Sequence, residues 1–161
     1  KEILLRLSKN PQNLKDNFFE KIRIIDLIKL NFDKFNDNKK INFYFKKFNK
    51  ENEIIFKDEI NYAIGNIIQN SILYSKSQVN IYLEEYSHDF LIKIEDDGYG
   101  FSKEVLDKLG EPYISKSKKG MGLGIFIAKN LIENMKGSII FYNSENNNAV
   151  VEIKFDKTIL L

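Results

Sequence analysis

The chain has 161 residues, of which 43% are hydrophobic and 30% are charged, and this is typical of one globular domain with its own core. It contains no cysteine, which excludes disulfides, cysteine-ligated metals and thiol nucleophiles, and no apolar run approaches the roughly 20 residues of a membrane-spanning helix. With 25 basic and 23 acidic residues, the net charge of +2 is too even for a dedicated nucleic-acid surface.

The first third of the chain is predicted to alternate between helix and strand. Apolar residues at helical spacing over 1–9 predict the last turns of a helix that begins upstream. A short strand is expected over 18–24. A helix follows over 25–35, where Ile25 and Ile28 begin the helical spacing.

Two short segments with strand composition come next. Alternating, β-branched and aromatic residues predict strands over 41–45 and 53–56. We expect these two strands to pair as a hairpin around the polar residues 49–52.

The longest predicted helix begins at Asp58, which we expect to serve as its N-cap. One face of about four turns is apolar or small. Its members are Ile60, Ala63, Ile64, Ile67, Ile68, Ser71 and Ile72. Asn66 and Asn70 are four residues apart and share a face beside this apolar stripe.

The remaining chain is predicted to contain two hairpins and two helices. Strands are expected over 78–85, 90–95, 138–142 and 149–155. Ser102 is the expected N-cap of a short helix to about 109, and a longer helix ends at Gly137. A loop rich in lysine, serine and glycine over 110–121 separates the helices. One α/β domain is therefore predicted.

Two glycine clusters flank this loop. Asp-Asp-Gly-Tyr-Gly over 96–100 ends a strand, and Gly-Met-Gly-Leu-Gly over 120–124 opens a helix. Glycines at a helix N-terminus let backbone N–H groups approach a phosphate, and the helix dipole favours its negative charge. The second cluster is neither a dinucleotide fingerprint, since Ile125 replaces the last glycine, nor a P-loop, since no Gly-Lys-Ser/Thr follows. Taken alone, a glycine-rich turn before a helix is more often plain turn chemistry than a phosphate site.

The order of these motifs resembles that of the ATP-binding domain of sensor histidine kinases, in the superfamily that also holds DNA gyrase, Hsp90 and MutL. The resemblance covers about 22–155. Four of the family's motifs have counterparts here in the same order. Residues 66–71 resemble the N box and 96–100 the first glycine box. Residues 111–113 resemble a remnant of the F box, and 120–124 the second glycine box. More narrowly, 109–113 and 121–129 are similar to the RegB/PrrB type of redox-responsive kinase.

This resemblance implies a fold and a division of the chain. The fold is the two-layer α/β sandwich called the Bergerat fold, a mixed sheet of about five strands against three helices, with a flexible ATP lid. Residues 1–15 are expected to be the end of the dimerisation and phosphoacceptor helix with its linker, and 16–161 the catalytic domain. Ser71, Leu73, Tyr113 and Met121 depart from the family pattern. The third glycine box is unclear, and 147–149 in its place receive no ligand role.

The resemblance also implies ATP and Mg²⁺ as cofactors. Asp96 would accept a hydrogen bond from the N6 amine of adenine and repel the oxygen of guanine, which favours ATP over GTP. Asn70 would offer an amide oxygen to Mg²⁺. The other expected ATP-binding residues are Asn66, Gly98, Gly100, Lys116, Gly120, Gly122, Leu123 and Gly124. The plainer alternatives are that Asp96 caps a turn and that the lysine loop is solvated surface.

The expected reaction is phosphotransfer and not hydrolysis. Asn66 stands where hydrolytic relatives carry a water-activating glutamate, and an amide cannot take a proton at neutral pH. His88, the only histidine, falls in a hairpin turn, so we expect a structural or surface role and no catalytic residue within this chain. The resemblance implies transfer of the γ-phosphate to a histidine on an upstream helical domain, for relay to a response regulator aspartate.

The implied partners are those upstream helices, a cognate response regulator and, at full length, a second copy in a homodimer; no nucleic-acid partner is expected. A cytoplasmic location is expected, with the full-length protein anchored in the inner membrane by an upstream segment. Two alternatives stay open. An anti-sigma-factor-type serine kinase shares the fold and is distinguished by its upstream sequence, whereas a degenerate docking module would not bind ATP.

Overall fold

The structure is a computed structural model that describes residues 20–36, 38–109 and 123–161. Its elements, in chain order, are β1 (Lys21–Arg23), α2 (Ile24–Phe35), β2 (Lys40–Lys46), β3 (Glu53–Ile55), α3 (Asp58–Tyr74), β4 (Gln78–Glu85), β5 (Asp89–Asp96), α4 (Lys103–Lys108), α5 (Gly124–Asn134), β6 (Ser138–Asn143), β7 (Ala149–Asp156) and the short 3-10 helix η1 (Lys157–Ile159).

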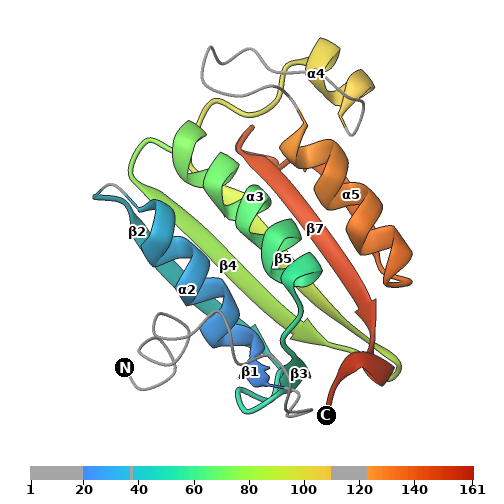
Figure 1. Ribbon diagram of the computed structural model, residues 1–161. Coiled ribbons are helices and arrows are strands. Elements are labelled where there is room, and N and C mark those ends of the chain that lie inside the picture. The colour runs from blue at the N-terminus through green and yellow to red at the C-terminus, as the bar shows by residue number, and fades with distance from the viewer. Residues whose placement is uncertain (1–19, 37, 110–122) are drawn as a thin grey trace, which may run out of the picture.

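Five strands form one mixed sheet in the order β2-β4-β5-β7-β6. β2 runs parallel to β4, and the other neighbours are antiparallel. Helices α2, α3 and α5 lie side by side across one face of this sheet, and α4 lies beyond its end (Figure 1). The predicted two-layer α/β sandwich with five strands and three covering helices is confirmed.

The core lies between the sheet and these helices because each strand alternates. Along β4, Val79, Ile81 and Leu83 are buried while the residues between them are partly exposed. The register continues this layer across the sheet, with Ile94 of β5 between Ile81 of β4 and Val151 of β7. Each such buried side chain stabilises the fold by about 2–5 kcal/mol relative to alanine.

Helix α3 supplies the largest helical share of the core. Its buried face comprises Ile60, Ala63, Ile64, Gly65, Ile67, Ile68, Ser71 and Ile72, which includes every residue of the predicted apolar stripe. Asp58 is the first helical residue and not the N-cap as predicted; the N-cap is Lys57, whose side chain makes no capping bond. The Asp58 carboxylate in the first turn still favours the helix dipole.

Both C-terminal hairpins are confirmed. β4 and β5 pair antiparallel around a turn in which the Tyr86 N–H donates to the Asp89 carbonyl at 2.8 Å. β6 and β7 pair in the same way. The Ser102 hydroxyl accepts a hydrogen bond from the Val105 N–H at 3.3 Å, so it is the N-cap of α4 as expected. Helix α5 ends at Asn134, three residues before Gly137.

The predicted hairpin of 41–45 with 53–56 is wrong. β2 pairs with β4, and β3 pairs antiparallel with β1. Between them Lys47 takes a left-handed conformation with φ of 52°, and Phe48 is buried with its ring 6.3 Å from that of Phe90. Burial of Phe48 turns the chain toward the core and separates the two strands. A parallel pairing joins strands far apart in sequence, so the local pattern could not predict it.

Three predictions lie outside the described residues. These are the helix over 1–9, the domain assigned to 1–15, and the loop over 110–121, which is the greater part of the lid expected over 102–121. Among the residues that the structure describes, no helix is both long and apolar enough to cross a membrane.

Candidate functional site

The described parts of the predicted motifs lie toward one end of the sheet. Figure 1 places the C-terminal end of α3 and the start of α5 at this end, beneath α4. β5 ends here at Asp96, and the turn between β6 and β7 comes close to Gly100. We call this region the site end.

Two asparagines line α3 at the site end. The side-chain amide N–H groups of Asn66 and Asn70 donate to the carbonyls of Tyr62 and Asn66, at 2.8 and 2.9 Å. These bonds to the preceding turn fix which way each amide points and direct both side-chain oxygens away from the helix. The Asn70 Oδ1 atom, which accepts no hydrogen bond from the described residues, is therefore available to a ligand.

The start of α5 lies directly against Asn66. A Cβ atom added at Gly124 would stand 2.4 Å from the Asn66 Oδ1 atom, closer than any side chain tolerates. Only glycine permits this approach, and it brings the N box and the second glycine box into contact. Leu123, the residue before the helix, accepts the first helical bond through its carbonyl, from Ile127 at 2.9 Å.

Asp96 is a buried carboxylate with one oxygen engaged. Its side chain lies at the end of β5 with an exposed fraction of 4%, and Oδ1 accepts from the Gly98 N–H at 2.8 Å. Burial raises the pKa of Asp96 to about 6, against the opposing effect of that hydrogen bond. At pH 7 it is mainly ionised, and no lysine or arginine among the described residues pairs with it. One oxygen thus caps the Gly98 turn, and the second can accept from a ligand.

Asp97, the next residue, has the opposite environment. Partial burial would raise its pKa, but hydrogen bonds from the Ser77 hydroxyl at 2.6 Å and from the Ser77, Gln78 and Lys76 amides lower it to about 2. The carboxylate therefore ties β5 to the connection between α3 and β4. No sequence motif marks Asp97, because its partners are one serine hydroxyl and backbone amides about 20 residues away in the chain.

Gly100 is held by the turn between β6 and β7. Its φ is +75°, and an added Cβ would lie 2.3 Å from the Asn147 carbonyl oxygen. Asn143 exchanges two hydrogen bonds of 2.8 Å with the backbone of Phe101, and the Asn147 amide donates to the Tyr99 carbonyl at 3.2 Å. The place of the third glycine box, which we left without a ligand role, thus supports the first glycine box. The run of asparagines was the signal that could have revealed this.

Part of the predicted site lies outside the described residues. This part comprises Lys116, Gly120, Gly122 and the F-box remnant at 111–113. Among the predicted residues that the structure describes, Asn66 contacts Gly124 and Asp96 accepts a hydrogen bond from Gly98. Asn70 lies one turn after Asn66 on α3, Gly100 follows β5 and Leu123 precedes α5.

His88 lies far from this region. It lies in the β4–β5 turn at the opposite end of the sheet, where its carbonyl accepts from the Lys157 N–H at 2.9 Å. The strand β5, which ends at Asp96, begins at the next residue, so eight steps of extended chain, or roughly 25 Å, separate His88 from Asp96. The position fits the structural or surface role expected for this histidine.

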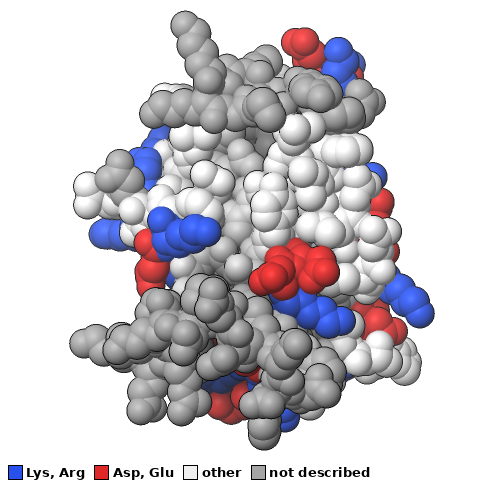
Figure 2. All heavy atoms as spheres, in the orientation of Figure 1, with Lys and Arg blue, Asp and Glu red and all other residues white. Residues whose placement is uncertain are grey.

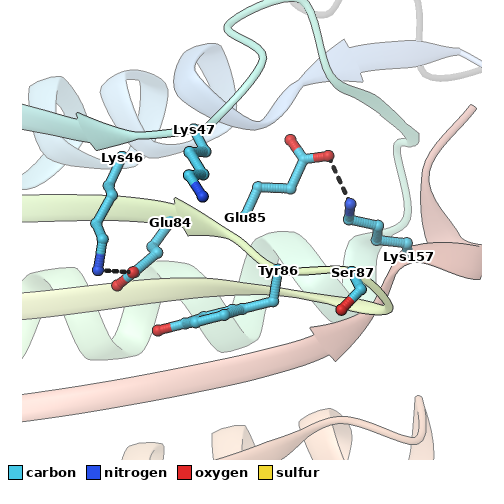
Figure 3. Close-up of a pocket in the computed structure, with 7 residues that line it drawn as sticks. All are labelled: Lys46, Lys47, Glu84, Glu85, Tyr86, Ser87 and Lys157. Atoms are coloured by element: carbon cyan, nitrogen blue, oxygen red, sulfur yellow. Dashed lines mark ion pairs between the residues drawn. The ribbon is translucent and has the colours of Figure 1, made fainter.

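A shallow hollow of about 480 Å³ also lies at that opposite end (Figure 3). It is lined by Lys46, Lys47, Glu84, Glu85, Tyr86, Ser87 and Lys157. Lys46 pairs with Glu84, and Lys157 pairs with Glu85 at 2.8 Å. Hydrogen bonds from these lysines lower the pKa of each glutamate. Because the glutamates are already paired, the hollow is a weaker candidate than the site end.

Comparison with known proteins gives one family and many relatives. The family model described as histidine kinase-, DNA gyrase B-, and HSP90-like ATPase matches residues 57–159. Sporulation kinase B of Bacillus subtilis is 35% identical over 95 residues, which are 57% of this chain and 22% of that protein. Sensor histidine kinase RegB of Cereibacter sphaeroides is 32% identical over 102 residues, 56% of this chain and 22% of that protein.

The solved structures agree in fold. The mycobacterial sensor histidine kinase MprB superposes with a TM-score of 0.72 at 15% identity, over 85% of this chain and 97% of that one. At this identity the likeness bears on the fold alone. The chain spans about a fifth of the length of the curated relatives named above, for each of which the shared segment is 22% of the whole.

Proposed function

This chain belongs to the family of histidine kinase-, DNA gyrase B- and HSP90-like ATPases, and we propose that it is the ATP-binding catalytic domain of a sensor histidine kinase. Membership of this family implies ATP binding. The observation that carries the proposal is the buried carboxylate of Asp96, which has one oxygen free and no cation beside it among the described residues. A carboxylate in this state is costly for the fold and useful for a ligand.

Asp96 selects adenine in this proposal. Its free oxygen accepts a hydrogen bond from the exocyclic N6 amine, and the same position in guanine carries an oxygen that the carboxylate repels. A hydrogen bond to a charged acceptor contributes about 1.5–3 kcal/mol. Gly98 holds the other oxygen in place, so the acceptor is oriented before the nucleotide arrives.

The residues present fit a magnesium ion. Asn70 offers a neutral amide oxygen, a ligand type that Mg²⁺ accepts, with water and substrate phosphates completing its shell. The bond from the Asn70 amide to the Asn66 carbonyl keeps that oxygen pointing away from α3. When bound, the ion neutralises phosphate charge. The N-terminus of α5 beside Asn66 adds the positive end of a helix dipole, so phosphates are proposed to lie between the two helices.

Phosphotransfer is favoured over hydrolysis because residue 66 is an asparagine and not a glutamate. An amide cannot remove a proton from water, and the Asn66 amide nitrogen donates one hydrogen bond to the Tyr62 carbonyl. The residue therefore orients groups without activating a nucleophile. The nucleophile of this proposal is a histidine on an upstream helical domain, because His88 lies at the far end of β5.

We extend the proposal to the longer protein to which such a domain belongs. Sensor histidine kinases among them support an upstream dimerisation and phosphoacceptor domain, a homodimer at full length and a response regulator that receives the phosphoryl group. We extend this to an inner-membrane anchor upstream and to a catalytic domain on the cytoplasmic side. A RegB-like, redox-responsive kinase is the subtype proposed from 109–113 and 121–129.

Incubation with γ-labelled ATP tests the proposal in three proteins: this chain, its His88→Ala variant and a longer form that carries the upstream histidine helix. We expect no label on the first two and an acid-labile label on the third. Circular dichroism of all three controls for folding. Labelling of the chain by itself that His88→Ala abolishes would contradict the assignment of the phosphoacceptor.

A further inference from the structure

The outer edge of β2 is an unpaired sheet edge. β2 comes first in the sheet order, and no strand among the described residues pairs with its other side. Figure 1 shows it at the margin of the sheet, beyond β4. With seven residues it is long for an exposed edge, and native proteins normally shorten, cover or charge such strands.

The hydrogen-bond pattern shows which backbone groups are unpaired. The Lys40 N–H donates to the Ser77 carbonyl at 2.9 Å, so Lys40 faces β4. In a parallel pair, alternate residues direct both N–H and C=O toward the neighbour. Asn42 and Tyr44 therefore also face β4, while the N–H and C=O groups of Ile41, Phe43 and Phe45 point outward. These three residues offer the pairing groups of a whole additional strand.

The side chains at this edge are aromatic and ringed by lysines. Tyr44 and Phe45 have exposed fractions of 48% and 37%. The ammonium of Lys29 lies 5.5 Å from the Phe43 ring centre, and that of Lys50 lies 4.4 Å from the Phe45 ring centre. Figure 2 shows basic side chains along the margin where Figure 1 places α2 and β2.

These lysines are largely uncompensated. Of the lysines on β2 or beside it, Lys46 pairs with Glu84. Among the described residues none of Lys29, Lys40, Lys47 and Lys50 has an acidic partner. The edge therefore combines apolar surface, unpaired backbone groups and excess positive charge.

The charge pattern decides what can pair there. A second copy added antiparallel about Phe43 would bring the uncompensated Lys40 and Lys47 of both copies to the same edge, with Lys40 of each copy opposite Lys46 of the other, which Glu84 already pairs. Like charges brought close together in this way destabilise a strand pair. A segment with acidic residues at both ends would meet the same lysines favourably. We propose that the outer edge of β2 binds an extended, acid-flanked segment of a partner protein as an added strand.

Amide hydrogen exchange on the whole chain tests this at residue resolution. The probe is a nine-residue peptide with a centre of alternating valine and threonine and two glutamates at each end. Without it, the amides of Asn42 and Tyr44 are protected and those of Ile41, Phe43 and Phe45 are not. At saturation the latter three should exchange at least about tenfold more slowly. Unchanged exchange at these three amides would overturn the proposal.

Three comparisons sharpen the test. A peptide with lysines in place of the glutamates should not bind, and equal binding would overturn the charge argument. Phe45→Pro removes one outward N–H and should weaken the probe by about tenfold or more relative to Phe45→Ala, which keeps it. Equal affinity of these two variants would contradict strand addition.

Charge variants test the same site independently if Phe45→Pro fails to fold. Lys40→Glu with Lys47→Glu should weaken the probe at least about tenfold at low salt, whereas Lys103→Glu with Lys108→Glu, on α4, should not. Equal effects of the two pairs would contradict the site. Protection that grows with protein concentration in the absence of probe would assign the edge to a second copy and overturn the proposal. None of these results depends on nucleotide binding.

Discussion

The two ends of the central sheet differ in whether their carboxylates are paired with a cation. At the site end, Asp96 is buried without a cation among the described residues, and its pKa rises to about 6. At the other end, Lys46 and Lys157 pair with Glu84 and Glu85, whose pKa values fall (Figure 3). We call the end with these two ion pairs the paired end. The hollow lies there, but the uncompensated carboxylate lies at the site end. Unpaired charge is therefore the better guide to function here.

Not every carboxylate at the site end lacks partners. Asp97, adjacent to Asp96, accepts hydrogen bonds from one hydroxyl and three backbone amides, and its pKa falls to about 2. The Asp97 carboxylate stabilises the fold locally, whereas the Asp96 carboxylate has an oxygen that can accept from a ligand. Substitutions at the two ends, and at these two neighbours, should separate stability from nucleotide binding.

The largest effect on stability is expected from Gly100→Ala. The new Cβ would meet the Asn147 carbonyl at 2.3 Å, and a φ of +75° disfavours any side chain. We expect a loss of about 2–4 kcal/mol in the free energy of unfolding, together with loss of ATP binding. Ser87→Ala, in the exposed turn at the paired end, should change stability by less than about 0.5 kcal/mol. Denaturant unfolding measures both, and equal losses would refute the contrast.

Asp96→Asn should move binding and stability in opposite directions. The amide keeps an oxygen for the Gly98 N–H but loses the charge, so ATP affinity should fall roughly ten- to a hundredfold. The free protein should gain up to about 3 kcal/mol at pH 7, because burying a neutral group removes the desolvation cost. Titration calorimetry and denaturant unfolding measure the two quantities. A variant that loses both affinity and stability would show that Asp96 is structural.

The same substitution changes the pH dependence. Because the folded pKa of Asp96 lies above its unfolded value, the folded state holds a proton that the unfolded state releases between about pH 4 and 6. This group therefore lowers stability as pH rises through that window, and its contribution should be absent from Asp96→Asn. Glu85→Gln, at the paired end, is the control and should leave ATP affinity unchanged.

Asp97→Asn should act on stability alone. The lowered pKa of Asp97 contributes stability that is present above about pH 4 and is lost as pH falls toward 2. We expect a loss of roughly 1–2 kcal/mol at pH 7, after allowance for solvent exposure, and little change in ATP affinity. Unfolding measured from pH 2 to 7 should show the variant and the parent converging at the acid end. A constant difference would mean that the charge of Asp97 is not the cause.

The smallest effect is expected at the paired end. Lys157→Met keeps the apolar stem and removes the charge that lies 2.8 Å from Glu85. Both side chains are partly buried. Pairs near the surface contribute about 0.2–1 kcal/mol, and salt screens them. The loss should therefore shrink in high salt. A loss above about 2 kcal/mol would show that the paired end is a second centre of stability.

The sequence predicted the elements that local pattern controls. The apolar stripe of α3, both C-terminal hairpins and the cap at Ser102 all depend on neighbours within a few residues. The approach of Asn66 to Gly124 followed from the family resemblance and not from periodicity. The pairing of β2 with β4 and the support of Gly100 by Asn143 and Asn147 depend on contacts between distant segments. Such contacts leave no periodic trace in a single sequence.

The central claim is that the site end binds ATP through a carboxylate that recognises adenine. Titration calorimetry of this chain with the magnesium complex of a non-hydrolysable ATP analogue, run beside the matching GTP analogue, tests it most directly. The account predicts saturable binding of the adenine nucleotide and at least about tenfold weaker binding of the guanine nucleotide. Equal affinity for the two nucleotides, or no binding of either, would contradict it.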